Sequence, residues 1–116
     1  MNLVIDQGNS SSKIAIFKGD KIVFENIYKS FSVDEAQELL KQFEIKKGIR
    51  SSVVGDDDRL SEYMCSELQR WIDLTNETEI PIENLHKTPK TLGRDRIAAC
   101  IGANYLQPNQ NLLVID

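Results

Sequence analysis

Polar residues suited to phosphate binding lie near the start of the chain, between two apolar runs. They begin at Asp6 and continue through Gly8, Asn9 and Ser10 to Lys13. Glycine lets a ligand approach the backbone closely, asparagine and serine donate hydrogen bonds, and a carboxylate at a strand end can hold a metal-bound water. These residues fit a triphosphate with its magnesium ion. An ordinary polar hairpin loop explains them equally simply.

A second group with chemical potential surrounds Asp95, which follows Gly93 and lies between Arg94 and Arg96. The helical pattern that begins here places Asp95 in a first turn, where the helix dipole and the arginines keep a carboxylate ionised. Asp95 either stabilises the helix start through an arginine, or accepts a proton from a substrate hydroxyl as a base. Taken alone, these residues favour the first interpretation.

The elements that must position the first group form a hairpin and its continuation. Apolar runs at residues 3–5 and 14–17 predict two strands, and residues 22–28 predict a third, antiparallel one. Ser32 and Glu35 then have the spacing of a capping box, which predicts a helix start. The helix that follows has one apolar face, so we expect it to pack on the sheet.

Helices and strands alternate further along the chain. Residues 49–54 predict a central strand, and a helical period of apolar residues then runs from Leu60 to Trp71 or Ile72. The aspartates at 56–58 precede this helix, and their negative charge suits a helix start better than a metal site.

The last third of the chain leads to the second polar group. Residues 79–82 predict a short edge strand, because proline is tolerated there. A third helix is expected from Gly93 to Tyr105, and residues 111–116 predict another strand. The order of elements predicts an α/β fold.

Length and composition exclude several classes of protein. The chain has 116 residues, a net charge of -4 and no clustered basic stripe, which argues for one domain and against a nucleic-acid partner. No apolar run could span a bilayer and no signal-peptide pattern opens the chain, so we expect no membrane partner and a cytoplasmic location. Cys65 and Cys100 lie in helical patterns, which predicts buried, reduced thiols without a functional role.

The two polar groups occur together in one known family. The chain carries Asp6-Gln-Gly-Asn-Ser10, then Pro89-Lys-Thr-Leu-Gly-Arg-Asp-Arg96, and ends in Leu113-Val-Ile-Asp116. This combination resembles the amino-terminal half of type III pantothenate kinase, over the whole chain. The family is part of the acetate and sugar kinase and actin-like ATPase superfamily, whose two ribonuclease H-like domains hold ATP in the cleft between them. The resemblance implies a mixed sheet in the order β-β-β-α-β-α-β-α.

The resemblance also implies roles for the first polar group. Asp6, Gly8, Asn9, Ser10 and Lys13 would form the first phosphate loop, which holds the phosphates of ATP. Asp6 would bind magnesium through a water molecule.

The second polar group would complete the substrate site. By resemblance, Asp95 is the catalytic base, while Gly93 and Arg96 line the pantothenate site, where arginine suits the acid's carboxylate. His86 stands at a pantothenate-site position where the family usually has a tyrosine, although an exposed loop histidine is an equally good interpretation. Asp116 would open a second phosphate loop and hold a potassium or ammonium ion.

The implied function is ATP-dependent phosphorylation of pantothenate, the first step toward coenzyme A. Residues 1–111 would form the first ribonuclease H-like domain and residues 112–116 the first strand of a second, missing one, so this fragment alone would be inactive. The longer protein would be a homodimer with its substrate site near the interface. A non-catalytic regulatory or interaction protein of the same fold, or a sugar-type kinase of the superfamily, are the alternatives. A base at Asp95 would distinguish the kinase from the regulator.

Overall fold

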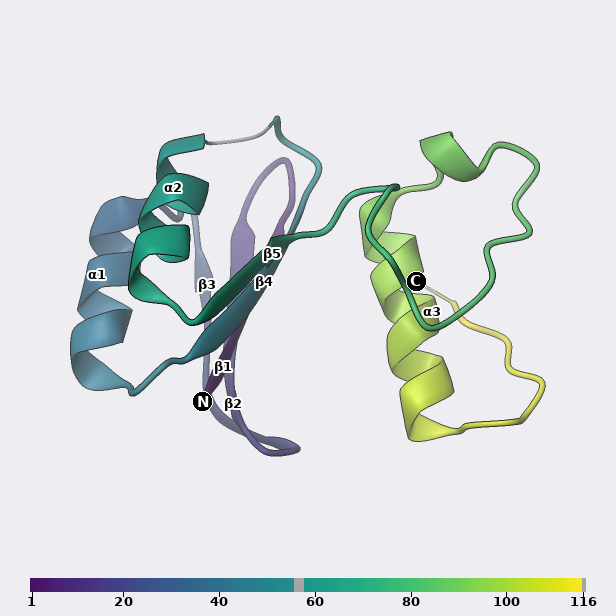
Figure 1. Ribbon diagram of the computed structural model, residues 1–116, viewed down its shortest axis with the longest axis horizontal. Coiled ribbons are helices and arrows are strands. Elements are labelled where there is room, and N and C mark those ends of the chain that lie inside the picture. The colour runs from purple at the N-terminus through teal and green to yellow at the C-terminus, as the bar shows by residue number, and fades with distance from the viewer. Residues whose placement is uncertain (56–57, 116) are drawn as a thin grey trace. The chain divides into compact units, whose positions relative to one another are not determined.

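The computed structural model describes residues 1–55 and 58–115 of the chain. The chain divides into two compact units, Met1–Asp73 and Leu74–Asp116, and each is described by itself (Figure 1). The division predicted at residue 111 stays a prediction. Among the described residues, no helix is both long enough and apolar enough to cross a membrane.

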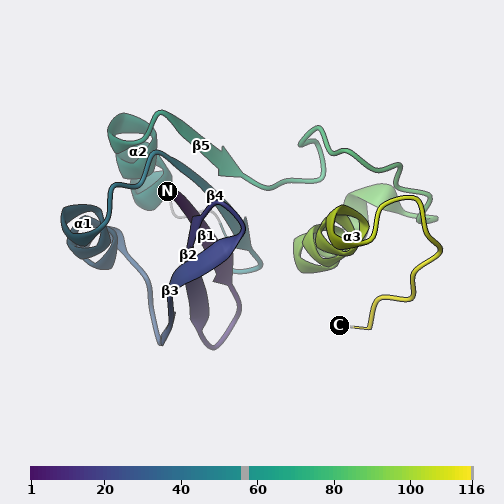
Figure 2. The ribbon, with the colours of Figure 1, turned by 90° about the horizontal axis from the view of Figure 1, so that it is seen from below.

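The first unit is built on one mixed sheet with five strands in the order β3-β2-β1-β4-β5. Strand β1 pairs antiparallel with β2 and parallel with β4, β2 pairs antiparallel with β3, and β4 pairs parallel with β5 (Figure 2). The elements of this unit are β1 (Asn2–Gln7), β2 (Ser12–Lys18), β3 (Lys21–Tyr28), α1 (Val33–Gln42), β4 (Lys47–Ser52), α2 (Asp58–Glu67) and β5 (Arg70–Asp73). With α3 (Arg94–Leu106) of the second unit, they confirm the predicted β-β-β-α-β-α-β-α order and the α/β, ribonuclease H-like fold class.

The core lies between the sheet and the two helices on one of its sides (Figure 1). Side chains alternate between the faces of a strand, so Leu3 and Ile5 of β1 point to the helices while Val4 points away. Leu60 and Met64 of α2 are fully buried in the same cluster. This alternation leaves a second, open face of the sheet, which carries Asp6.

The capping box predicted for α1 is present. The hydroxyl and the backbone N–H of Ser32 both donate to the Glu35 carboxylate, at 2.5 and 2.8 Å. Glu35 thereby satisfies a backbone donor that a helix start leaves without a partner in the helix. The side-chain hydrogen bond from Ser32, with the backbone bond second, lowers the pKa of the Glu35 carboxyl.

The fifth strand lies earlier in the chain than predicted. Trp71 and Ile72 belong to β5 rather than to the second helix, and residues 79–82 form no strand in the structure. The helical spacing of apolar residues in α2 continues beyond the last residue of the helix. The backbone N–H of Gln69, however, donates to the carbonyl of Lys46 at 2.9 Å and not to a carbonyl within the helix. Trp71 is aromatic and Ile72 is β-branched, and both residue types favour a strand. They pair with β4 as part of β5. The predicted position was therefore wrong, although the predicted number of strands before α3 was right.

The predicted central strand, β4, contains a buried charge. Arg50 is 1% exposed, and its Nε donates to Oδ1 of Asp73 at 2.6 Å. Ser61 of α2 accepts from Arg50 Nη2 at 2.9 Å and donates to Asp73 at 2.6 Å, and the Trp71 indole N–H also donates to Asp73, at 3.0 Å. This network ties β4, β5 and α2 together, so the guanidinium is buried with its charge paired.

The second unit contains a short 3-10 helix, Pro89–Thr91, and α3, which confirms the predicted third helix. Residues 111–115 form no strand; a strand needs a hydrogen-bonded neighbour, and α3 and the loops described in this unit supply none. Cys65 in α2 and Cys100 in α3 are free thiols, as predicted, but both are exposed rather than buried. Their positions in apolar helical patterns do not place them on the packed faces.

Candidate functional site

The first predicted site is a hairpin turn whose two strands are held in register. Asp6 pairs with Lys13 and Gln7 with Ser12 across β1 and β2. The N–H of Gly8 donates to the carbonyl of Ser11 at 2.9 Å, which closes the turn. The predicted phosphate loop is therefore a tight turn with Asn9 and Ser10 exposed at its tip.

Asp6 and Lys13 form a loose ion pair on the open face of the sheet. Lys13 Nζ lies 3.9 Å from Asp6 Oδ2, and their side chains are 68% and 48% exposed. An exposed pair at this distance contributes little to stability, so both charges are available to a ligand. Lys13 can neutralise the charge of an anionic phosphate, and Asp6 can bind a hydrated cation.

The residues around Asp6 fit a hydrated magnesium ion. Magnesium keeps several waters and usually takes one or two carboxylates together with substrate phosphates, so a protein cage is not required. Asp6 supplies one half-exposed carboxylate, and the buried hydroxyl oxygen of Ser51, in the neighbouring strand, has no hydrogen-bond partner among residues 1–55 and 58–115. Both are oxygen donors of the kind that surround this ion.

The end of β4 lies beside the predicted phosphate loop, a proximity that the sequence did not indicate. Asp6 pairs with Ser51 and Gln7 with Ser52 in the parallel register, and the N–H of Val53 donates to the carbonyl of Gln7 at 3.1 Å. The polar run Arg50–Ser52 inside a strand predicted to be central was the available signal. It carried no predicted role.

The second predicted site lies at the start of α3. Asp95 is half-buried in the first turn, and its Oδ1 accepts the backbone N–H of Arg96 at 2.9 Å. A Cβ atom at Gly93 would collide with Oδ1 of Asp95, so a larger residue there would displace the Asp95 carboxylate from its present position. Gly93 and Asp95 thus share one compact helix start, with the Arg96 side chain exposed beside it.

His86 is exposed in the loop before this helix. The ring Nδ1 accepts the backbone N–H of Thr88 at 3.1 Å, and the backbone N–H of His86 donates to Asn84 Oδ1 at 3.0 Å. The ring is therefore held by local bonds, with Nε2 as the remaining ring nitrogen. Asp116, predicted to bind a monovalent cation, and Asp56 and Asp57, predicted to precede α2, lie outside the described residues.

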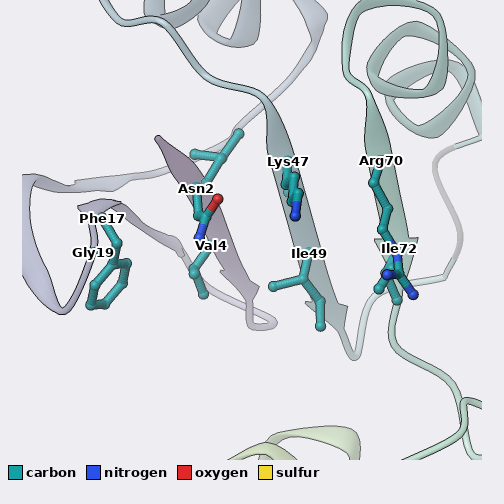
Figure 3. A pocket seen from close by; sticks show the side chains of 10 residues that line it. Asn2, Val4, Phe17, Gly19, Lys47, Ile49, Arg70 and Ile72 are labelled. Carbon is teal, nitrogen blue, oxygen red and sulfur yellow. The ribbon is translucent and has the colours of Figure 1, made fainter.

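The structure gathers each predicted group within its own unit. The phosphate-loop residues belong to the first unit, and His86, Gly93, Asp95 and Arg96 belong to the second. A pocket of about 430 Å³ also opens on the first unit, but it lies at the other end of the sheet, where Asn2, Lys47 and Arg70 begin their strands (Figure 3). Neither Asp6 nor Lys13 lines it.

Comparison with known proteins identifies the family of the chain. The family model described as type III pantothenate kinase matches residues 2–116. The chain belongs to the type III pantothenate kinase family. A type III pantothenate kinase of Phocaeicola vulgatus is 42% identical over 120 residues, which cover 100% of this chain and 48% of that protein. Similar proteins of the same name from Bacteroides fragilis and Christiangramia forsetii are 35% and 36% identical, again over 100% of the chain and 48% of each relative.

The chain thus spans about half the length of the curated type III pantothenate kinases that it matches.

Proposed function

We propose that this chain forms part of an ATP-dependent pantothenate kinase, which transfers a phosphoryl group to pantothenate in the first step toward coenzyme A. One observation carries the proposal: the β1–β2 turn presents Asp6 and Lys13 beside exposed Asn9 and Ser10, in a chain of the type III pantothenate kinase family. The protein that acts would have the length of its relatives, and the present 116 residues would not be active alone.

The phosphate loop would bind the nucleotide. The backbone at Gly8 permits close approach of phosphate oxygens, Asn9 and Ser10 supply hydrogen-bond donors, and Lys13 balances negative charge. Asp6 would hold magnesium through a bound water, and that ion would neutralise the charge on the phosphates. These roles explain why the loop is polar and its tip exposed although β1 carries the buried residues Leu3 and Ile5.

The start of α3 would bind and activate the acceptor. Arg96 offers a planar fork of donors to the carboxylate of pantothenate, and Gly93 and His86 would line the same site. Asp95 would accept the proton of the primary hydroxyl as its oxygen bonds to the γ-phosphorus of ATP and the bond to the ADP oxygen breaks. The proton ends on Asp95 and the leaving group is ADP.

Three further features belong to the proposed enzyme. Asp116 would take part in holding potassium or ammonium. The pantothenate site would lie near a homodimer interface and draw on both subunits, and the enzyme would act in the cytoplasm on a small, soluble substrate.

The proposal is tested by Asp6→Asn in the full-length protein. Asparagine keeps the shape but loses the charge, and loss of a group that orients a metal ligand typically costs about 10- to 100-fold. We expect the KM for magnesium ATP to rise by that factor, with the folded protein equally stable. Asp34→Asn, on the exposed surface of α1, is the matched control and should leave the KM unchanged. Unaltered ATP kinetics in a folded Asp6→Asn protein would reject the phosphate-loop assignment.

A further inference from the structure

The hydroxyl group of Ser51 is buried at the end of β4 and has no hydrogen-bond partner among the described residues. Ser51 is 8% exposed, and its Oγ makes no hydrogen bond within the part of the chain that the structure describes. A buried hydroxyl without a partner costs free energy, so native proteins hold few of them, and each calls for an explanation.

The register of the sheet places this hydroxyl beside Asp6. Ser51 and Asp6 are Cα partners in the parallel pairing of β4 with β1, and paired residues project from the same face of a sheet. That face is the open one, because Leu3 and Ile5 project to the helices. Adjacent strands are about 4.8 Å apart, so both side chains border one small region of the surface.

The neighbouring serine shows that this arrangement is specific to Ser51. Ser52 lies on the other face of β4, and its Oγ accepts the N–H of Val54 at 3.3 Å. The Ser52 hydroxyl also lies 3.4 Å from the carbonyls of Val54 and Gly55. Ser52 therefore shapes the end of the strand, whereas the Ser51 hydroxyl serves no such local bond.

We propose that Ser51 is a further ligand-binding residue of the phosphate site, whose hydroxyl hydrogen-bonds an oxygen of the magnesium nucleotide held beside Asp6. This inference rests on the proposed function. A hydroxyl can donate to a phosphate oxygen or accept from a metal-bound water, and either bond gives the buried Oγ its missing partner. Strand pairing already fixes the backbone of Ser51. Binding would therefore cost less conformational entropy than it would at a residue in a flexible loop.

The test is Ser51→Ala in the full-length protein, with ATP as the probe and no pantothenate present. Calorimetry measures the Kd for ATP in the presence of magnesium. Thermal unfolding measures the melting temperature of the nucleotide-free protein. Loss of a hydrogen bond to a charged ligand should weaken binding about tenfold. Removing an unpaired buried hydroxyl should leave the melting temperature of the nucleotide-free protein unchanged or raise it.

Repeating the titration with EDTA separates the two kinds of bond. A loss that persists without magnesium assigns the bond to a phosphate oxygen, and a loss that disappears assigns it to a metal-bound water. Ser52→Ala is the matched control, and it should lower the melting temperature because its hydrogen bonds within the protein are lost.

Two results for Ser51→Ala would overturn the inference: an unchanged Kd, or a lower melting temperature of the nucleotide-free protein, which would show a structural role. Asp6→Asn, titrated in parallel, separates the two proposals. If wild type binds ATP and Asp6→Asn weakens binding while Ser51→Ala does not, only the role of Ser51 fails. If wild type does not bind ATP, or Asp6→Asn binds as well as wild type, the proposed phosphate site itself fails.

Discussion

In the first unit the two charged residues of the predicted site, Asp6 and Lys13, stand on strands, whereas in the second unit the predicted site residues stand on a loop and a helix start. Strand β1, which carries Asp6, pairs over its whole length with β2 on one side and β4 on the other. The bonds that hold His86 and Asp95 in the second unit join residues only one or two positions apart. Strand pairing therefore fixes the backbone on both sides of the predicted phosphate loop, whereas hydrogen bonds to near neighbours hold the predicted substrate-site residues.

The distribution of buried residues follows the same division. Eleven buried residues form the core cluster, and all of them lie in the first unit. In the second unit the buried apolar residues are Leu74 and Ile97, while Tyr105, Leu113 and Ile115 are largely exposed. A unit with so small a core gains little from burial, so its geometry depends more on local hydrogen bonds. Substitutions can test this contrast, in order of expected effect.

Asp95→Asn gives the largest expected effect and tests whether the locally held residue is catalytic. Asparagine keeps the shape of the side chain and its acceptor oxygen but cannot take the substrate proton. Loss of a general base costs about a hundredfold to ten-thousandfold in rate, and a loose transition state places the loss toward the lower end. We expect kcat of the full-length protein to fall by at least that lower factor with little change in KM for pantothenate.

Stability separates this role from a structural one. If Asp95 only stabilises the start of α3, the melting temperature should fall, by an amount equivalent to about 1 kcal/mol, with kcat close to wild type. Loss of stability with intact turnover would reject the catalytic role and leave the second unit without a base at this position.

Asp73→Ala tests the tertiary network that supports the first unit. It removes the Asp73 carboxylate that pairs with the guanidinium of Arg50, whose side chain is 1% exposed. Breaking a buried pair in this way costs about 3 kcal/mol or more. Chemical denaturation of the chain should show this loss. Glu38→Ala removes one side of an exposed pair, 2.7 Å from Lys41, and as the control it should cost less than about 0.5 kcal/mol. Similar losses in the two variants would contradict the stabilising role assigned to the network.

Gln7→Leu tests whether the side-chain amide of Gln7, on the face of β1 that packs against the helices, has a hydrogen-bond partner. Gln7 alternates onto the face of Leu3 and Ile5, and its Oε1 is buried without a hydrogen bond within residues 1–55 and 58–115. Leucine has a similar volume and no polar atom, so the variant should be more stable by between about 1 and 3 kcal/mol. Gln37→Leu, exposed on α1, is the control and should give no gain. A destabilised Gln7→Leu protein would show that the amide has a partner in solution.

The residues of the first unit also show what the sequence could predict. Alternation of apolar residues predicted β1, β2 and β3, and the Ser32–Glu35 spacing predicted the start of α1, because these signals are local. Strand β5 was misplaced because the period of α2 continues through Trp71, and only pairing with β4 decides between helix and strand. Residue types and spacing predicted both polar motifs, whose roles stay proposals. The position of Ser51 beside Asp6 was not predicted, since it depends on the register of two strands distant in the sequence.

Ser32→Ala gives the smallest effect and compares the two helix starts directly. Helix α1 begins with a capping box between Ser32 and Glu35, whereas α3 begins at Gly93, which has no side chain to take part in one. Loss of a capping residue costs about 1 kcal/mol at neutral pH. Because the Ser32 hydrogen bonds lower the pKa of the Glu35 carboxyl, their stabilisation is present above the usual carboxyl pKa and is lost as pH falls through the lowered one. The difference in unfolding free energy between wild type and variant should therefore shrink at acid pH. Ser66→Ala, whose hydroxyl donates to the carbonyl of Tyr63 at 2.7 Å with no carboxylate involved, should show a pH-independent difference. A Ser32→Ala difference that is equally independent of pH would mean that the ionised Glu35 carboxylate does not hold the start of α1.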